Sequence, residues 1–231
     1  KSASYSMLIG ILAHGLWLAC VLLALDYKVP AGIVALVVAL QPLATGALSG
    51  TVTGEHTSLN QWLGLTVGFI GVVLTVAFRI DFQSYSSVFG YLIPLGSVMG
   101  ITVATLIQRQ IELRNNEQKL PLDLSLFYQS MATAAVLLLP AFFIEDLSTQ
   151  WDSEFVYAMI WLVLAVSLAS YLLMWRLIEK INATRVASLF YLGSPVTMLM
   201  AWMAFGDKIK TMDILGLAIV FLGVFITQLK K

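Results

Sequence analysis

The sequence predicts an all-α fold, a polytopic membrane helical bundle, from three observations: its composition, its long apolar segments and an internal repeat. Hydrophobic residues make up 59% of the 231 residues and charged residues only 11%, and the mean hydropathy is +0.89. A chain of this length cannot bury so much apolar surface inside a water-soluble globule. Lipid is therefore the expected solvent for most of the chain.

Eight segments are long and apolar enough to span a bilayer, which takes about 20 residues as a helix. They cover residues 6–25, 31–52, 60–78, 88–107, 124–144, 155–175, 185–205 and 212–229. The connections are short and carry most of the charge, so we expect one membrane domain and no soluble one. Cys20 is the only cysteine and lies inside the first segment, which excludes a disulfide framework and a cysteine-based metal site.

The distribution of basic residues predicts the orientation of the bundle. Eight spans place both termini on one side, and nine of the 13 Lys and Arg residues fall on that side. By the positive-inside rule the termini are cytoplasmic; a chance distribution of so few residues is the alternative. The net charge of zero argues against a nucleic-acid partner, which requires a surplus of basic residues.

An internal repeat relates the second and third spans to the last two. The alignment pairs the following residues: Pro42 with Pro195, Gly54 with Gly206, Glu55 with Asp207, Gly64 with Gly216 and Gly71 with Gly223. The shared positions are glycine, proline and acidic residues rather than Leu and Val, which favours a structural repeat over a chance match. Five spans separate the partners, so the copies cross the membrane in opposite directions. Inverted repeats of this kind are typical of secondary transporters.

The two copies differ in the number of helices that they contain. We expect residues 1–80 to form a partial first unit of three helices and residues 81–231 to form a complete second unit of five. This difference predicts that two further helices precede residue 1 in the full protein.

The stretch "QPLATGALSGTVTGEHTSLNQWLGLTVGFIG", from Gln41 to Gly71, resembles the end of an EamA domain, the repeat unit of the drug/metabolite transporter superfamily. Residues 88–229 resemble a complete second unit, in which Asp207 occupies the position where the family usually has Glu. The resemblance implies ten helices in the full protein, a central substrate cavity and export of amino acids or related metabolites from bacteria, across the inner membrane. Drug efflux is the alternative function. The resemblance does not name the substrate.

Polar and aromatic side chains inside the spans are the candidates for substrate binding. An ionisable group within a span is a functional hypothesis by default, so His14 is a candidate for binding an anionic group or relaying a proton. A neutral imidazole that is hydrogen-bonded between helices is the alternative. The repeat pairs polar positions of the two copies around one pocket. The predicted substrate-binding residues are His14, Trp17, Gln41, Thr45, Ser97, Ser167, Tyr171, Tyr191 and Ser194.

Other residues have predicted structural roles. Pro42 and Pro195 remove a backbone donor inside a span, and each is either a hinge beside the cavity or a plain kink. Glu55 and Asp207 are expected to be caps or ion-pair partners. Ser58 and Gln61 have the spacing of a capping box, and Trp175 and Trp202 are expected to lie in an interfacial aromatic belt. Gln129, Ser130 and Thr133 form a polar cluster that either lines a cavity or joins helices.

The sequence contains none of the usual catalytic motifs. It has no HExxH, no GxSxG and no phosphate-binding loop with a Walker lysine, so an enzyme is not predicted and no cofactor or metal is expected. A channel would need a charged ring or a filter-like segment, which leaves only an oligomeric pore as a rival. The prediction is a secondary transporter, either a monomer or a homodimer, with a small-molecule solute and with protons as candidate coupling ions.

Overall fold

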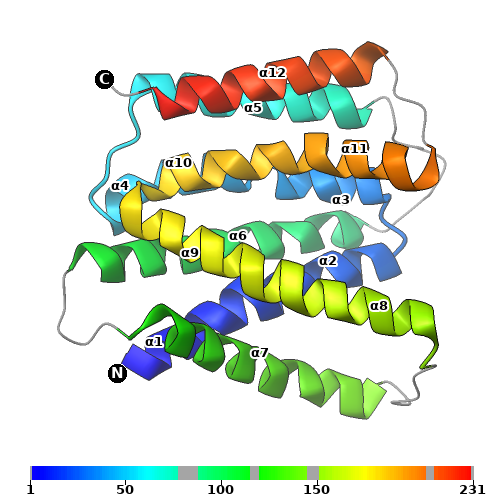
Figure 1. Ribbon diagram of the computed structural model, residues 1–231. Helices are drawn as coiled ribbons and strands as arrows, with labels where there is room; N and C mark the ends of the chain where they lie inside the picture. Colours follow the sequence, from blue (N-terminus) through cyan, green and yellow to red (C-terminus); the bar gives the residue numbers. More distant parts are fainter. Residues whose placement is uncertain (1, 78–87, 115–119, 145–150, 207–210, 230–231) are drawn as a thin grey trace.

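The computed structural model describes residues 2–77, 88–114, 120–144, 151–206 and 211–229, and all regular structure within these ranges is helical (Figure 1). Seven helical runs in the described part of the chain are long and apolar enough to cross a membrane: Ser2–Asp26, Ala31–Val52, Leu59–Ala77, Phe89–Leu113, Leu122–Phe143, Ser153–Lys180 and Thr211–Gln228. They match seven of the eight predicted spans. The remaining predicted span, over residues 185–205, is also helical, but it is divided into three consecutive segments.

The first five predicted spans contain seven α-helices and one π-helical segment. The first span is formed by α1 (Ser2–Gly10), the π-helical η1 (Ile11–Leu16) and α2 (Trp17–Asp26), and the second by α3 (Ala31–Val38) and α4 (Gln41–Val52). The next three spans are α5 (Leu59–Ala77), α6 (Val88–Leu113) and α7 (Leu122–Ile144).

The last three predicted spans contain two further irregular segments. The sixth span is formed by α8 (Ser153–Trp161), the π-helical η2 (Leu162–Ser170) and α9 (Tyr171–Lys180). The seventh consists of α10 (Ala183–Ser188), the 3₁₀-helical η3 (Leu189–Leu192) and α11 (Gly193–Phe205), and the eighth is α12 (Thr211–Gln228).

The irregular segments occur at matched places in the two copies of the repeat. The shift of 153 residues that aligns Pro42 with Pro195 moves residues 11–16 onto 164–169, inside the second π-helical segment. The same shift moves the α3–α4 interruption at residues 39–40 onto 192–193, where η3 ends and α11 begins. Both interruptions come shortly before a proline, which has no backbone N–H to donate to the carbonyl group four residues earlier.

The two π-helical segments have side-chain partners for carbonyl groups of the disturbed helices. The Tyr171 hydroxyl donates to the carbonyl oxygen of Ala13 at 3.1 Å, and the Ser170 hydroxyl donates to that of Ala165 at 2.9 Å. Thr133 donates to the carbonyl oxygen of Gly10, at the start of η1, at 2.9 Å. Within a bilayer such bonds are needed, because no water is present to satisfy the backbone.

Helices α5 and α12 pack side by side (Figure 1) through glycines that are partners in the repeat. A Cβ atom added at Gly64 would touch the Thr227 hydroxyl, and one added at Gly216 would touch the Thr75 hydroxyl. Because Gly64 pairs with Gly216 and Thr75 with Thr227 in the repeat, the repeat converts one of these contacts into the other. This reciprocity is that of an approximate two-fold axis through the seam, and it fits the predicted inverted repeat.

The predicted capping box is present at the start of α5, and glycines end two other helices. The backbone N–H of Ser58 donates to Gln61 Oε1 at 2.9 Å, and that of Gln61 donates to Ser58 Oγ at 3.3 Å, which is the predicted capping box. Gly54 and Gly206, partners in the repeat, follow α4 and α11 with φ angles of 74° and 70°. Glycine adopts this left-handed conformation without steric cost.

The bundle has two distinct ends, for which we use fixed names. At the terminal end, α1 begins and α12 ends, together with the last turns of α4, α6 and α9 (Figure 1). At the distal end, α2 ends, α3 and α8 begin, and α11 ends. Ser2 and Gln228 therefore lie at the same end of the bundle, as an even number of spans requires.

Candidate solute cavity

A cavity of about 1030 Å³ opens between α2, α3, α5, α9 and α11 in the distal half of the bundle. This volume lies just above the range of about 300–1,000 Å³ that is typical of small-molecule sites. Its described lining residues are mostly aliphatic or aromatic, and none of them is charged. The polar groups among them are Gln41, Thr75, Ser170, Tyr171, Tyr191, Ser194 and Thr197.

Each helix irregularity lies in or next to the wall of this cavity. Ser170 belongs to the second π-helical segment, and Trp17 directly follows the first. Ala39 is part of the α3–α4 interruption, whereas Tyr191 and Gly193 flank the junction of η3 and α11. Irregular backbone at membrane depth is tolerated where it lines a cavity, and π-helical turns are frequent at functional sites.

The cavity brings together five of the nine predicted substrate-binding residues. These are Trp17, Gln41, Tyr171, Tyr191 and Ser194, from five different helical segments. Pro42, one of the two predicted hinges, also lines the cavity. The other predicted hinge, Pro195, is buried next to the lining residue Ser194.

Gln41 and Thr45 form one polar unit at the start of α4. The Gln41 amide donates to the Thr45 hydroxyl at 3.2 Å, and the hydroxyl donates to the Gln41 carbonyl oxygen at 3.0 Å. Gln41 reaches the cavity, whereas Thr45, one turn further along, is fully buried behind it. Thr45 therefore orients Gln41 and does not itself line the cavity.

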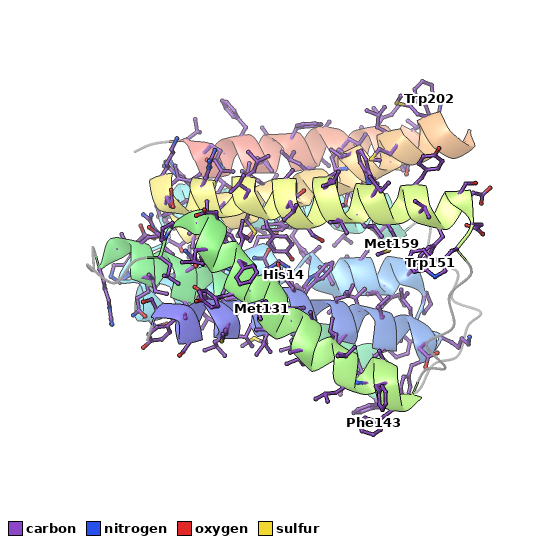
Figure 2. All side chains as sticks on the ribbon, turned by 60° about the horizontal axis from the view of Figure 1, so that its bottom comes forward. His14, Met131, Phe143, Trp151, Met159 and Trp202 are labelled. Atoms are coloured by element: carbon purple, nitrogen blue, oxygen red, sulfur yellow. The ribbon has the colours of Figure 1, made fainter. Side chains whose placement is uncertain are left out.

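His14 lies inside the bundle (Figure 2), next to the cavity wall rather than in it. Its Nε2 atom is 3.3 Å from Gln129 Oε1, and its ring centroid is 3.8 Å from that of Tyr171, which does line the cavity. His14 thus occupies the interhelical position that the sequence allowed as its alternative, one side chain away from the space where a solute would bind.

Gln129 on α7 is the centre of a buried polar chain that sequence reasoning identified only as a weak cluster. Its Oε1 atom accepts from Trp175 Nε1 at 3.1 Å as well as facing His14, and its amide donates to the Ser125 hydroxyl at 3.2 Å. Ser125 in turn bonds to Ser6 at 2.9 Å. The chain joins α1, η1, α7 and α9 behind the cavity wall.

Trp175 is fully buried, so its predicted place in an interfacial belt is wrong. The side chain hydrogen-bonds with Gln129 in the interior, which gives its N–H a partner away from the membrane surface. Trp202 is 51% exposed and projects from the outside of the bundle (Figure 2), as a residue of such a belt does.

Two predicted site residues lie away from the cavity. Ser167 is exposed on η2 and is not among the lining residues, whereas Ser170 is. The π-helical turns explain the difference, because they change the face on which each later residue falls. Ser97 is fully buried and donates to the carbonyl oxygen of Pro94 at 2.6 Å; Ile101 is the one residue of α6 among the described lining residues.

Glu55 has the predicted role of an ion-pair partner. Its carboxylate accepts two bonds from Arg109, at 3.0 Å from Nε and 2.6 Å from Nη2. Its partner in the repeat, Asp207, lies outside the described residues. Arg109, which the sequence indicated only as one of the basic residues of the terminal end, is thus part of a contact between α6 and the loop after α4.

A bundle of membrane-spanning helices around an uncharged cavity at mid-depth is the architecture of a membrane transporter. The model of the EamA-like transporter family matches residues 88–229. The chain belongs to this family, as the resemblance of its motifs predicted.

Two relatives are named only as transporters. The chain is 26% identical over 212 residues to the uncharacterized transporter YvbV of Bacillus subtilis (strain 168), covering 90% of this chain and 66% of the relative. It is 23% identical over 209 residues to an uncharacterized transporter of Archaeoglobus fulgidus, covering 89% of this chain and 71% of the relative. The chain thus spans about two thirds of the first relative.

The fold also matches that of a protein of known crystal structure. The TM-score is 0.80 at 19% sequence identity, and the match covers 96% of this chain and 74% of the other. At this identity the likeness shows the fold alone.

Proposed function

We propose that this protein moves a small solute across the membrane by alternating access, with the cavity as its solute site. The observation that carries the proposal is that the cavity ends at mid-depth. Its described lining residues reach Pro42 on α4, Ile101 on α6 and Met174 on α9, whereas these helices continue to Val52, Leu113 and Lys180. A cavity confined to one half of the membrane is what one state of an alternating-access cycle requires.

The chemistry of the lining favours a solute without net charge. Amide and hydroxyl groups such as those of Gln41, Ser194 and Thr197 can bind a neutral or zwitterionic head group, and Trp17 and Phe190 offer apolar surface for its body. Export of an amino acid or a related metabolite fits this combination best. Efflux of a drug-like compound is the second candidate, because the volume of about 1030 Å³ exceeds what most amino acids fill.

The matched irregularities provide the hinges for the movement. Pro42 and Pro195, together with η1 and η2, lie near the middle of their spans, where the distal and terminal halves of a helix can change direction independently. We propose that residues 1–80 and 81–231 are the two inverted units that exchange roles in the cycle. We further propose that the terminal end faces the cytoplasm of a bacterium, in its inner membrane, and that His14 couples transport to protons.

The test is uptake of labelled amino acids by the full-length protein in proteoliposomes, with and without a proton gradient. Gln41→Ala and Ser194→Ala should reduce uptake about tenfold each, the effect of one lost hydrogen bond to a bound ligand. Ser167→Ala, which alters an exposed residue of the same type outside the lining, is the matched control and should transport like wild type. Equal uptake by all variants would place the solute site elsewhere.

A further inference from the structure

A layer of polar side chains lies in the terminal half of the bundle, beside apolar residues such as Ile178 and Val186. Thr57, in the loop after α4, donates to the carbonyl oxygen of Gly46 at 2.6 Å and is hydrogen-bonded to Ser49 at 3.0 Å. It also meets Thr184 of α10 at 3.3 Å. Water can replace such hydrogen bonds at small net cost, so this layer can separate more easily than the glycine seam between α5 and α12.

Arg109 ties three elements together at the terminal end. Besides the two bonds to Glu55, its Nη1 atom donates to the carbonyl oxygens of Ile178 at 2.7 Å and Glu179 at 3.3 Å, in the last turn of α9. Its side chain is only 10% exposed. One side chain of α6 therefore fixes both the loop after α4 and the end of α9, so loss of this contact would release both.

Two buried hydroxyl groups on α6 lie between the cavity and this ion pair without a hydrogen-bond partner among the described residues. They belong to Thr102 and Thr105, both fully buried. Thr105 is one turn from Ile101, which lines the cavity, and one turn from Arg109, so these three residues share a face of α6. An unpartnered buried hydroxyl costs free energy, and this cost disappears once water or a solute reaches it.

We infer that the second half of the solute path runs along this face of α6, from Ile101 past Thr105 to Arg109, with the Glu55–Arg109 pair as its gate. The inference rests on the proposed transport function, since it describes the state opposite to the one observed. In that state α4 and α9 move away from α6, and Thr105 lines a hydrated passage that opens at the terminal end. The passage suits the same class of solute, polar but without net charge.

Thiol accessibility tests the path without knowledge of the solute. In the full-length protein with Cys20 and any further cysteine replaced by Ala, a single Thr105→Cys should react with a membrane-impermeant methanethiosulfonate added at the terminal face and not with reagent added at the distal face. Ala104→Cys is the matched control, because Ala104 is equally buried on the same helix but packs in an apolar cluster with Ile9 and Ala13. It should react at least about tenfold more slowly, since a thiol must be hydrated to be attacked.

Glu55→Gln tests the gate. Loss of the charge weakens the bidentate pair, so labelling of Thr105→Cys from the terminal face should become about tenfold faster. Should this variant fail to fold, Glu55→Asp, which keeps the charge but shortens the side chain, replaces it and should give a smaller increase. Unchanged labelling in a folded variant would overturn the gate.

The two proposals fail in different ways. Labelling of Thr105→Cys no faster than that of Ala104→Cys, in a protein that transports, would overturn the path and leave the transport function intact. Labelling only from the distal face would also overturn it. Labelling of Thr105→Cys from the terminal face that is faster than labelling of Ala104→Cys would support the path. If the same protein transported no amino acid, only the proposed substrate class would be contradicted.

Discussion

The glycine seam between α5 and α12 allows a quantitative test, by Gly64→Ala. A Cβ atom at Gly64 would lie 2.5 Å from the backbone nitrogen of Thr227 and 2.6 Å from the carbonyl oxygen of Gly223. Both are backbone atoms, which cannot rotate away, so the helices must separate. Overpacking of this kind costs about 1–3 kcal/mol.

Gly193→Ala is the control for the intrinsic effect of the methyl group. Gly193 is helical, and nothing lies within 4 Å of the position that its Cβ atom would take. Alanine there should stabilise the protein slightly, because a helical Gly costs roughly 0.5–1 kcal/mol relative to Ala. The same gain applies at Gly64, so the difference between the two variants isolates the overpacking cost.

Thermal unfolding in one detergent at one scan rate measures this difference. For a chain of this length, each kcal/mol shifts the Tm by about 2–4 °C, so Gly64→Ala should unfold roughly 2–12 °C below Gly193→Ala. Gly216→Ala should also unfold at a lower Tm than Gly193→Ala, because its Cβ atom would touch the Thr75 hydroxyl in the reciprocal contact. A Tm for Gly64→Ala equal to that of Gly193→Ala would refute the close approach of α5 and α12.

Two further predictions concern the polar chain behind the cavity. Gln129→Leu should lower the free energy of unfolding by about 1–3 kcal/mol, because the buried N–H of Trp175 loses its acceptor. In the same thermal assay the control Ser130→Ala, at an exposed neighbouring position, should unfold like wild type. Equal Tm shifts in the two variants would contradict the hydrogen bond between Gln129 and Trp175. His14→Gln should abolish any dependence of uptake on the pH gradient, because glutamine cannot carry a proton at physiological pH; a variant that keeps the wild-type dependence in proteoliposomes would exclude His14 as the coupling residue.

Most of the fold was predictable because a helix that crosses the bilayer needs about 20 mostly apolar residues, and hydropathy identifies such segments directly. The ends of the helices were less predictable. The segment predicted to end at residue 107 continues through α6 to Leu113, because the polar side chains of this extension find partners. Arg109 binds Glu55, and the Gln110 amide donates to the carbonyl oxygen of Val52 at 2.8 Å. Such partners come from distant parts of the sequence and leave no local pattern.

The candidate site was predictable where the repeat and regular helix geometry both apply. Gln41 and Ser194 were placed at one cavity by their positions before the paired prolines, and both line it. Ser167 was placed by the same shift, but the π-helical turns of η2 change the face of the helix, and Ser170 lines the cavity instead. No proline or glycine marks η2, so its irregularity depends on tertiary contacts that the sequence does not reveal.

The reciprocal contacts of the α5–α12 seam have a consequence for kinetics. A two-fold axis through the seam exchanges the two faces of the membrane, so in the proposed alternating-access cycle a change that keeps this symmetry perturbs the outward-facing and the inward-facing conformations equally. The axis exchanges Gly64 with Gly216, so a double variant that changes both residues should alter how fast the conformations interconvert while leaving the ratio of their populations unchanged. The Glu55–Arg109 pair lies away from this axis, at one end only, and a change there should shift that ratio. In the proposed cycle the preferred resting conformation is therefore set by off-axis contacts, whereas the direction of net flux depends on the gradients of the solute and of any coupled ion.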